Sequence, residues 1–431
     1  MRRAWWPLGV MFALVVVLWF VRTTLIPDEA ASPDDAPALA SAAPESATRD
    51  AMTLENPAAS RESAEHGADE IELCGGLWVK TRADGNIDDD DFKRVLRLPE
   101  ERARMLEALR AESSEFARAA AIRLALIGSE PPPLPEGATT CEPAQCEVQR
   151  RYATRFAEAR DALAQMATTT RDPQVYALAF NNCQVSQPSE GACQLVSAEQ
   201  WARLDPGNAT PWLFVLQQAG QQRDAATQNE ALHRIATSTR SDQFFFRLSR
   251  LVIDHVPDDD ASALVALTLA SEVFGIEVAY ALPGYQTLLE QCRGSALRDA
   301  NRRQTCNAVA EFLVERGDTL LERNIGVRLG AQVGWPAERV ERLRGESVAY
   351  QASRESANNF NPTSTCADIR RDLEYVRLNA RRGEAGALRE WVAESDIKPE
   401  AFIRAERDEQ ARRAAEAASA AAAASAASAP R

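Results

Sequence analysis

The chain has 431 residues, of which 45% are hydrophobic and 26% are charged, so most of it can bury a core and fold. Acidic side chains outnumber basic ones by 63 to 49, and the formal net charge is −14. This balance argues against nucleic acid as a partner, because phosphate binding requires a basic face. Three histidines in the whole chain leave few metal ligands and few general bases.

A long apolar run occupies residues 4–26, with tryptophans near its ends and Arg22 as its single charge. A helix of about 18 apolar residues spans roughly 27 Å, close to the hydrocarbon thickness of a bilayer. Arginines precede the run and acidic residues follow it, so the positive-inside rule places residues 1–3 in the cytoplasm and the rest of the chain outside it. We predict an uncleaved, single-pass transmembrane signal anchor. The alternative is a cleaved signal peptide, which normally has a shorter apolar region and a small-residue cleavage site.

The chain beyond the anchor divides by composition into three parts. Residues 27–69 are rich in Ala, Pro, Ser and acids, and such a segment buries too little apolar surface to become ordered. We therefore expect a disordered linker there, an exported folded domain at residues 70–410 and an Ala-rich low-complexity tail at residues 411–431. The strong preference for Arg over Lys suggests a bacterium with GC-rich DNA. The expected location is the bacterial inner membrane, with the domain in the periplasm.

All eight cysteines lie beyond the predicted anchor. Outside the cytoplasm an even number of cysteines indicates disulfides, whereas buried free thiols would be usual in the cytosol. A metal site is less favoured, because no Cys-x-x-Cys pair and no neighbouring His supports one. Local spacing suggests four candidate disulfides: Cys141–Cys146, Cys183–Cys193, Cys292–Cys306 and, for the remaining two cysteines, Cys74–Cys366.

Helical periodicity extends through almost the whole of residues 70–410. Apolar residues recur at steps of three and four, as at Ile369, Leu373 and Val376, and Gly and Pro interrupt the pattern at intervals typical of helix hairpins. We predict an all-α fold of about ten to twelve helices, arranged as antiparallel hairpins, with a short strand at residues 71–79. Asp318, which follows Gly317, is expected to cap the next helix.

A second apolar segment lies at residues 261–282 and includes Glu272 and Glu277 near its middle. A charged group at the centre of a membrane span costs roughly 2.5 to 3.5 kcal/mol. We therefore predict a buried core helix, with a second membrane span as the alternative.

The sequence DPGNA at residues 205–209, followed by Trp212, matches an inter-repeat turn and the aromatic opening of a first helix. On these residues, positions 204–239 resemble a tetratricopeptide repeat. The match departs from the family where Gln228 replaces a small Ala and Arg240 replaces the closing Pro. The resemblance implies paired antiparallel helices and a groove for a partner protein. A generic helical hairpin is the alternative.

Chemical motifs are sparse. The acidic run that ends at Asp91 matches half of a calcium loop, but Lys80 and Arg82 occupy its first ligand positions, so we favour an acidic turn that caps a helix. The cluster of phenylalanines at residues 244–246 favours core packing over an exposed docking patch. We identify no catalytic, cofactor-binding or metal-ligating residue. Candidate partner contacts are Trp212, Phe244 and Phe245.

The sequence thus favours a membrane-anchored, exported helical scaffold or adaptor that binds a protein or another component of the cell envelope, without catalysis and without a cofactor. One alternative is an envelope hydrolase on a helical fold, which would need a pocket with two carboxyl groups about 5 to 9.5 Å apart. A second alternative is a purely structural envelope protein.

Overall fold

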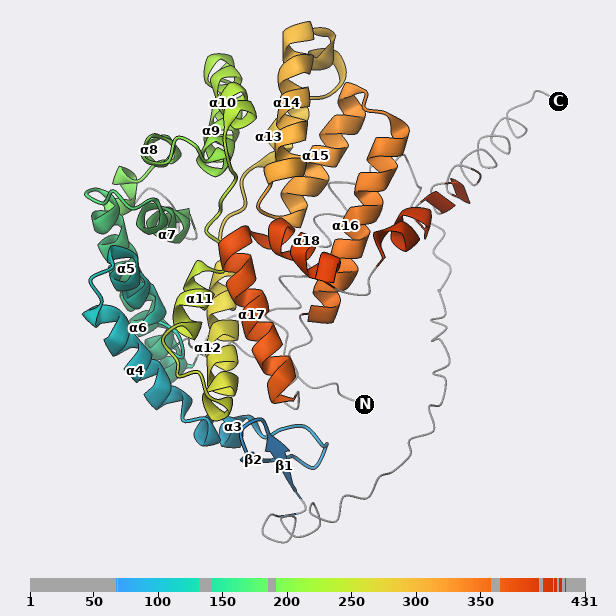
Figure 1. Ribbon diagram of the computed structural model, residues 1–431. Coiled ribbons are helices and arrows are strands. Elements are labelled where there is room, and N and C mark those ends of the chain that lie inside the picture. The colour runs from blue at the N-terminus through green and yellow to red at the C-terminus, as the bar shows by residue number, and fades with distance from the viewer. Residues whose placement is uncertain are drawn as a thin grey trace, which may run out of the picture. The chain divides into compact units, whose positions relative to one another are not determined.

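The computed structural model describes residues 67, 69–129, 131, 142–184, 191–357, 365–394, 398–405, 407–408, 411–412 and 415. The predicted anchor at residues 4–26, nearly all of the predicted linker and most of the predicted tail lie outside these residues and stay predictions. The chain divides into two compact units, Met1–Leu96 and Arg97–Arg431. The elements of both are labelled in Figure 1.

The described part of the first unit begins with a β-hairpin. Strand β1 (Glu70–Leu73) pairs antiparallel with β2 (Leu77–Lys80). Gly75 and Gly76 between them adopt positive φ, which glycine tolerates best. The sequence predicted one short strand at residues 71–79. The structure has two strands there, because Gly75 and Gly76 form a turn that divides the segment.

Helix α3 (Asp89–Val95) follows the hairpin and begins in the acidic run. The side chain of Asp88 accepts hydrogen bonds from the backbone N–H groups of Asp90 and Asp91, so it caps this helix. Asp91 accepts a hydrogen bond from the backbone N–H of Lys80 at 2.9 Å. These contacts agree with the predicted acidic, helix-capping turn.

The second unit is predominantly α-helical, as predicted. Its described α-helices, with two short 3-10 helices, are α4 (Leu98–Ala111), α5 (Glu115–Leu124), α6 (Pro143–Ala167), α7 (Pro173–Gln184), η1 (Gly191–Leu195), α8 (Ala198–Leu204), α9 (Ala209–Gln222), α10 (Ala225–Thr237), α11 (Arg247–Ile253), α12 (Asp260–Val278), α13 (Tyr285–Gln291), η2 (Gly294–Arg298), α14 (Ala300–Arg316), α15 (Leu320–Val333), α16 (Ala337–Ala357), α17 (Cys366–Arg382) and α18 (Glu384–Glu394).

Helices that follow one another along the chain pack together. Examples are α4 with α5, α9 with α10, α14 with α15 and α17 with α18 (Figure 1). Contacts of α10 with α14 and of α15 with α16 join these pairs.

There are more helices than the roughly ten to twelve that periodicity predicted. The short helices α8, α11 and α13, of 7 residues each, give little periodic signal.

The prediction that Asp318 caps a helix is wrong. Thr319 is the N-cap of α15, and its hydroxyl accepts a hydrogen bond from the backbone N–H of Glu322 at 3.2 Å. Asp318 points into the protein instead, where its Oδ2 accepts from the backbone N–H of Gln243 at 3.0 Å. Asp318 and Thr319 are both residues that can cap a helix. Thr319 caps α15, and Asp318 forms a hydrogen bond inside the protein instead.

Helix α12 is the one described helix that is long and apolar enough to cross a membrane, and 61% of its apolar window is buried inside the protein. It packs against α11 and α17. Glu277 is fully buried and accepts hydrogen bonds from the backbone N–H of Leu248 at 3.0 Å and from the Ser249 hydroxyl at 2.5 Å. It thus binds the beginning of α11, which has no side-chain cap of its own. These contacts fit the predicted core helix.

Two of the four predicted disulfides are confirmed, Cys183–Cys193 and Cys292–Cys306. Cys74, Cys146 and Cys366 are also disulfide-bonded. Cys141, the predicted partner of Cys146, lies outside the described residues. The pairing of Cys74 with Cys366 stays a prediction.

Helices α9 and α10 form the hairpin expected at residues 204–239, but a tetratricopeptide arrangement is not supported. The departures from that pattern have local roles. Gln228 is buried and donates to the carbonyl of Ala219 at 3.1 Å, and Arg240 pairs with Asp205 at 2.5 Å. The segment is therefore described as a helical hairpin.

Candidate functional site

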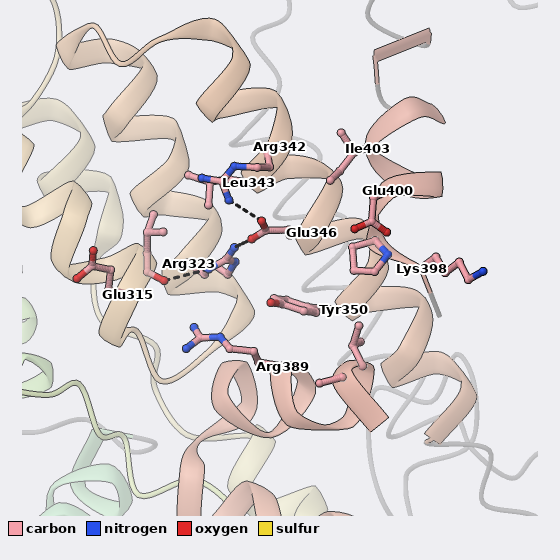
Figure 2. A pocket seen from close by; sticks show the side chains of 14 residues that line it. Glu315, Arg323, Arg342, Leu343, Glu346, Tyr350, Arg389, Lys398, Glu400 and Ile403 are labelled. Atoms are coloured by element: carbon pink, nitrogen blue, oxygen red, sulfur yellow. Dashed lines mark hydrogen bonds and ion pairs between the residues drawn. The ribbon is translucent and has the colours of Figure 1, made fainter. Parts of the chain in front are cut away.

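One cavity in the described residues is a groove of about 850 Å³. The end of α14, helices α15, α16 and α18, and the helical residues 399–405 line it (Figure 2). We call it the Arg323 groove.

Arg323 lies at the base of this groove and is held from several sides. Its side chain donates to the carbonyl of Val314 at 3.0 Å and to the carboxylate of Glu346 at 2.5 Å. Its guanidinium carbon lies 5.3 Å from the centre of the Tyr350 ring. Only 3% of the residue is exposed, and its buried Nε has no hydrogen-bond partner. The guanidinium is therefore fixed in place, and its buried Nε–H donor has no acceptor within the described residues.

Two arginines, Arg323 and Arg342, share the carboxylate of Glu346 in this groove, and a third arginine lines it. Glu346 also accepts from Arg342 of α16 at 2.6 Å. Arg389 of α18 lines the same groove and, within the described residues, has no hydrogen bond or ion pair. Figure 2 shows Arg323 and Arg389 on the same side of the Tyr350 ring. Burial lowers the pKa of Arg323, and the positive charge of Arg389 adds to this decrease.

The opposite wall is formed by residues 398–403, which include the exposed Lys398 and the half-buried Ile403. This wall packs closely on α16 at Gly345, where a Cβ atom would lie 2.5 Å from the Cα of Ile403. Glycine is thus required for the two segments to approach. The wall adds apolar surface beside the charged base of the groove.

A second, smaller cavity is a cleft of about 400 Å³. It lies where the segment between α10 and α11 meets the end of α14 and the end of α17. Both Asp242 and Asp318 line it, and we call it the arginine cleft after its cationic residues. These are Arg240, Arg247, Arg316, Arg381 and Arg382.

Behind the cleft lies a network of buried polar groups. Glu322 is fully buried and accepts hydrogen bonds from Ser241 at 2.9 Å, from Tyr285 at 3.1 Å and from the backbone N–H of Asp318 at 2.6 Å. Burial raises the pKa of Glu322. Burial also raises the pKa of Asp318 well above its usual value, and the negative charges of Asp242 and Glu322 raise it further. The network thus favours protonated carboxyl groups.

The segment that enters this cleft is strained. Phe244 and Phe246 have φ values of 58° and 61°, a left-handed conformation that is unfavourable for bulky side chains. Ring packing stabilises both residues, since Phe244 stacks on Trp201 at 6.4 Å and Phe246 stacks on Phe274 at 5.0 Å. Strained backbone is often found at functional sites.

The three predicted partner contacts lie in different surroundings. Phe244 is buried, and Phe245 is half-buried and lines the arginine cleft. Trp212 lies on α9, where Arg234 packs 5.6 Å from its ring centre, and it lines neither of the two cavities. A role for these residues in partner binding stays a prediction.

Sequence reasoning did not identify the residues that define the two cavities. The clearest signal for Arg323 was a charged pair, Glu322-Arg323, early in a helix that is otherwise largely apolar. Arg389 and Arg381 gave no signal, because only the tertiary fold brings them into the two cavities. Comparison of the chain with models of protein families, with curated proteins and with solved structures finds no match.

Proposed function

We propose that the protein is a membrane-anchored, exported helical scaffold that binds an acidic segment of a partner protein in the Arg323 groove. The observation that supports this best is the buried Arg323 guanidinium, with its unused Nε, in the same groove as the unpaired Arg389. The apolar run at residues 4–26 supports the anchor, and the number of cysteines supports an oxidising compartment.

The charges of the groove favour an anionic ligand. Four cationic and three anionic side chains line it, whereas the whole chain has a net charge of −14. Arg323 and Arg389 repel each other, and a carboxylate between them would relieve this repulsion. Because Val314 and Glu346 already fix Arg323, binding would cost little side-chain entropy there.

The shape of the groove fits a peptide segment. Its volume of about 850 Å³ lies within the range of ligand-binding clefts, roughly 300 to 1,000 Å³. Tyr350, Val392 and Ile403 offer apolar contacts beside the arginines. An acidic residue flanked by an apolar residue would use both surfaces. The hydrolase and the purely structural protein stay alternative hypotheses.

Site-specific crosslinking in the native membrane tests this function. A photoreactive residue would replace Ala393, which is exposed and lines the groove. The control position is Val148 on α6, which is 44% exposed and lines neither cavity. We expect one discrete protein adduct from position 393, none from position 148, and loss of the adduct when Arg389→Glu is added. No adduct, or an adduct that is unaffected by Arg389→Glu, would contradict the proposal.

A further inference from the structure

The arginine cleft has more cationic side chains than nearby acids can neutralise. Arg240 pairs with Asp205, Arg247 pairs with Asp242 at 3.3 Å, and Arg382 pairs with Glu390 at 3.5 Å. The other two arginines have no carboxylate partner within the described residues. They are Arg316, which donates to the carbonyl of Thr239 at 3.1 Å, and Arg381, which has no hydrogen bond.

The cleft also contains an unused buried acceptor. Asn379 is 1% exposed, and its side-chain amide donates to the carbonyl of Tyr375 at 2.7 Å. Its Oδ1 is buried and has no hydrogen-bond partner. Buried polar atoms are nearly always paired in folded proteins. Within the described residues, the Oδ1 of Asn379 is therefore an acceptor left for a donor group in the cleft.

We propose that the arginine cleft binds a phosphate monoester whose organic part carries a hydroxyl or amine. The two arginines without acid partners, Arg316 and Arg381, match the charge of a phosphate dianion. The donor group of the ligand would bind the Oδ1 of Asn379. A carboxylate, with one charge and two oxygens, would leave part of this cationic surface unused.

The acids of the cleft do not oppose such a ligand. Burial raises the pKa of Asp242 and that of Asp318. Both side chains are already engaged, since Asp242 pairs with Arg247 at 3.3 Å and Asp318 accepts a hydrogen bond from the backbone N–H of Gln243 at 3.0 Å. The volume of about 400 Å³ suits a small molecule.

Calorimetric titration of the full chain at neutral pH tests the proposal with defined probes. These are inorganic phosphate, glycerol 3-phosphate, hexanoyl lysophosphatidic acid, which keeps one free hydroxyl, and, as a neutral control, glycerol. We expect glycerol 3-phosphate to bind at least about tenfold more tightly than inorganic phosphate, which has no organic part with a hydroxyl to reach Asn379. If hexanoyl lysophosphatidic acid binds more tightly still, the phosphate monoester is a lipid headgroup; otherwise it is a soluble ester.

Three variants and one control connect binding to the cleft. Arg381→Gln and Arg316→Gln, both at exposed positions, should each weaken binding of all phosphate probes by about tenfold. Asn379→Leu should remove the preference for glycerol 3-phosphate over inorganic phosphate. Arg371→Gln, on the same helix but outside both cavities, is the charge-matched control and should leave binding unchanged.

Absence of binding to any phosphate probe would overturn the proposal, as would equal effects of Arg381→Gln and Arg371→Gln. The latter result would mean that Arg381 acts only through the overall charge of the protein. None of the residues that line the Arg323 groove lines this cleft. Failure here would therefore leave the proposed partner binding unaffected.

Discussion

Gly383 is the residue on which the junction between α17 and α18 depends. Its backbone has φ 72° and ψ 165°, a conformation that is essentially restricted to glycine, and its N–H donates to the carbonyl of Asn379 at 2.8 Å. A Cβ atom at this position would overlap the Oδ1 atom of Asp318. The lack of a side chain at Gly383 therefore leaves room for Asp318 at the base of the arginine cleft.

Gly383→Ala is therefore expected to lower the free energy of unfolding by about 2 to 3 kcal/mol, through backbone strain and the clash with Asp318. The matched control is Gly275→Ala within α12, where a Cβ atom would meet nothing within 4 Å. That substitution should stabilise the protein by about 0.5 to 1 kcal/mol. Denaturant unfolding of both variants measures the difference, and equal effects would contradict the assigned role of Gly383.

Glu277 couples stability to pH. Burial raises its pKa from 4.5 to about 7, although hydrogen bonds from α11 partly oppose the shift. Since the folded state binds the proton more tightly, this group contributes stability that is complete below pH 4.5 and is lost as the pH rises through about 7.

Glu277→Gln should remove this contribution. The difference in unfolding free energy between wild type and variant should shift in favour of the variant by about 3 kcal/mol from pH 4 to pH 8. Denaturant titrations of both proteins across this range provide the measurement. Comparison with the variant separates Glu277 from the other buried acids, which are present in both proteins. If the unfolding free energies of the two proteins changed with pH in parallel, the pKa of Glu277 would be the same in the folded and unfolded states, which would contradict this prediction.

At the level of elements, the disulfide Cys292–Cys306 joins the end of α13 to α14 across a sequence separation of 14 residues. Closing a loop of this size stabilises a protein by roughly 3 kcal/mol in the chain-entropy model. The double variant Cys292→Ser, Cys306→Ser should lose stability of this order in thermal or denaturant unfolding. Because Cys183–Cys193 remains in that variant, its melting temperature should still respond to reductant. A double variant as stable as the wild type would show that the bridge adds nothing.

The sequence predicted elements better than it predicted sites. Periodicity and turn residues located the hairpin of α9 and α10, the core helix α12 and two disulfides, because these features depend on local spacing. Asp318 was misassigned because a neighbouring threonine competed for the same cap. The two cavities depend on arginines and acids that lie far apart in the sequence, such as Arg323 and Arg389. The periodicity of apolar residues within one helix does not indicate which residues of distant helices come together.

At the level of the whole molecule, the charge distribution explains how an acidic protein could select an acidic partner. The net charge of −14 disfavours non-specific association with anions. Specific binding must then rely on local cations, and the buried Arg323 and the exposed Arg389 supply these in one groove. Binding of this kind should weaken as ionic strength rises, because salt screens the exposed charges.

The most direct test of partner binding is the dissociation constant between the full chain and the segment crosslinked at position 393. It should be measured for wild type, Arg389→Glu and Arg344→Glu; Arg344 is an exposed residue of α16 that lines neither cavity. We predict that Arg389→Glu weakens binding by at least about tenfold, whereas Arg344→Glu changes it by less than about twofold. Equal effects of the two charge reversals, or no effect of either, would contradict binding of an acidic segment in the Arg323 groove.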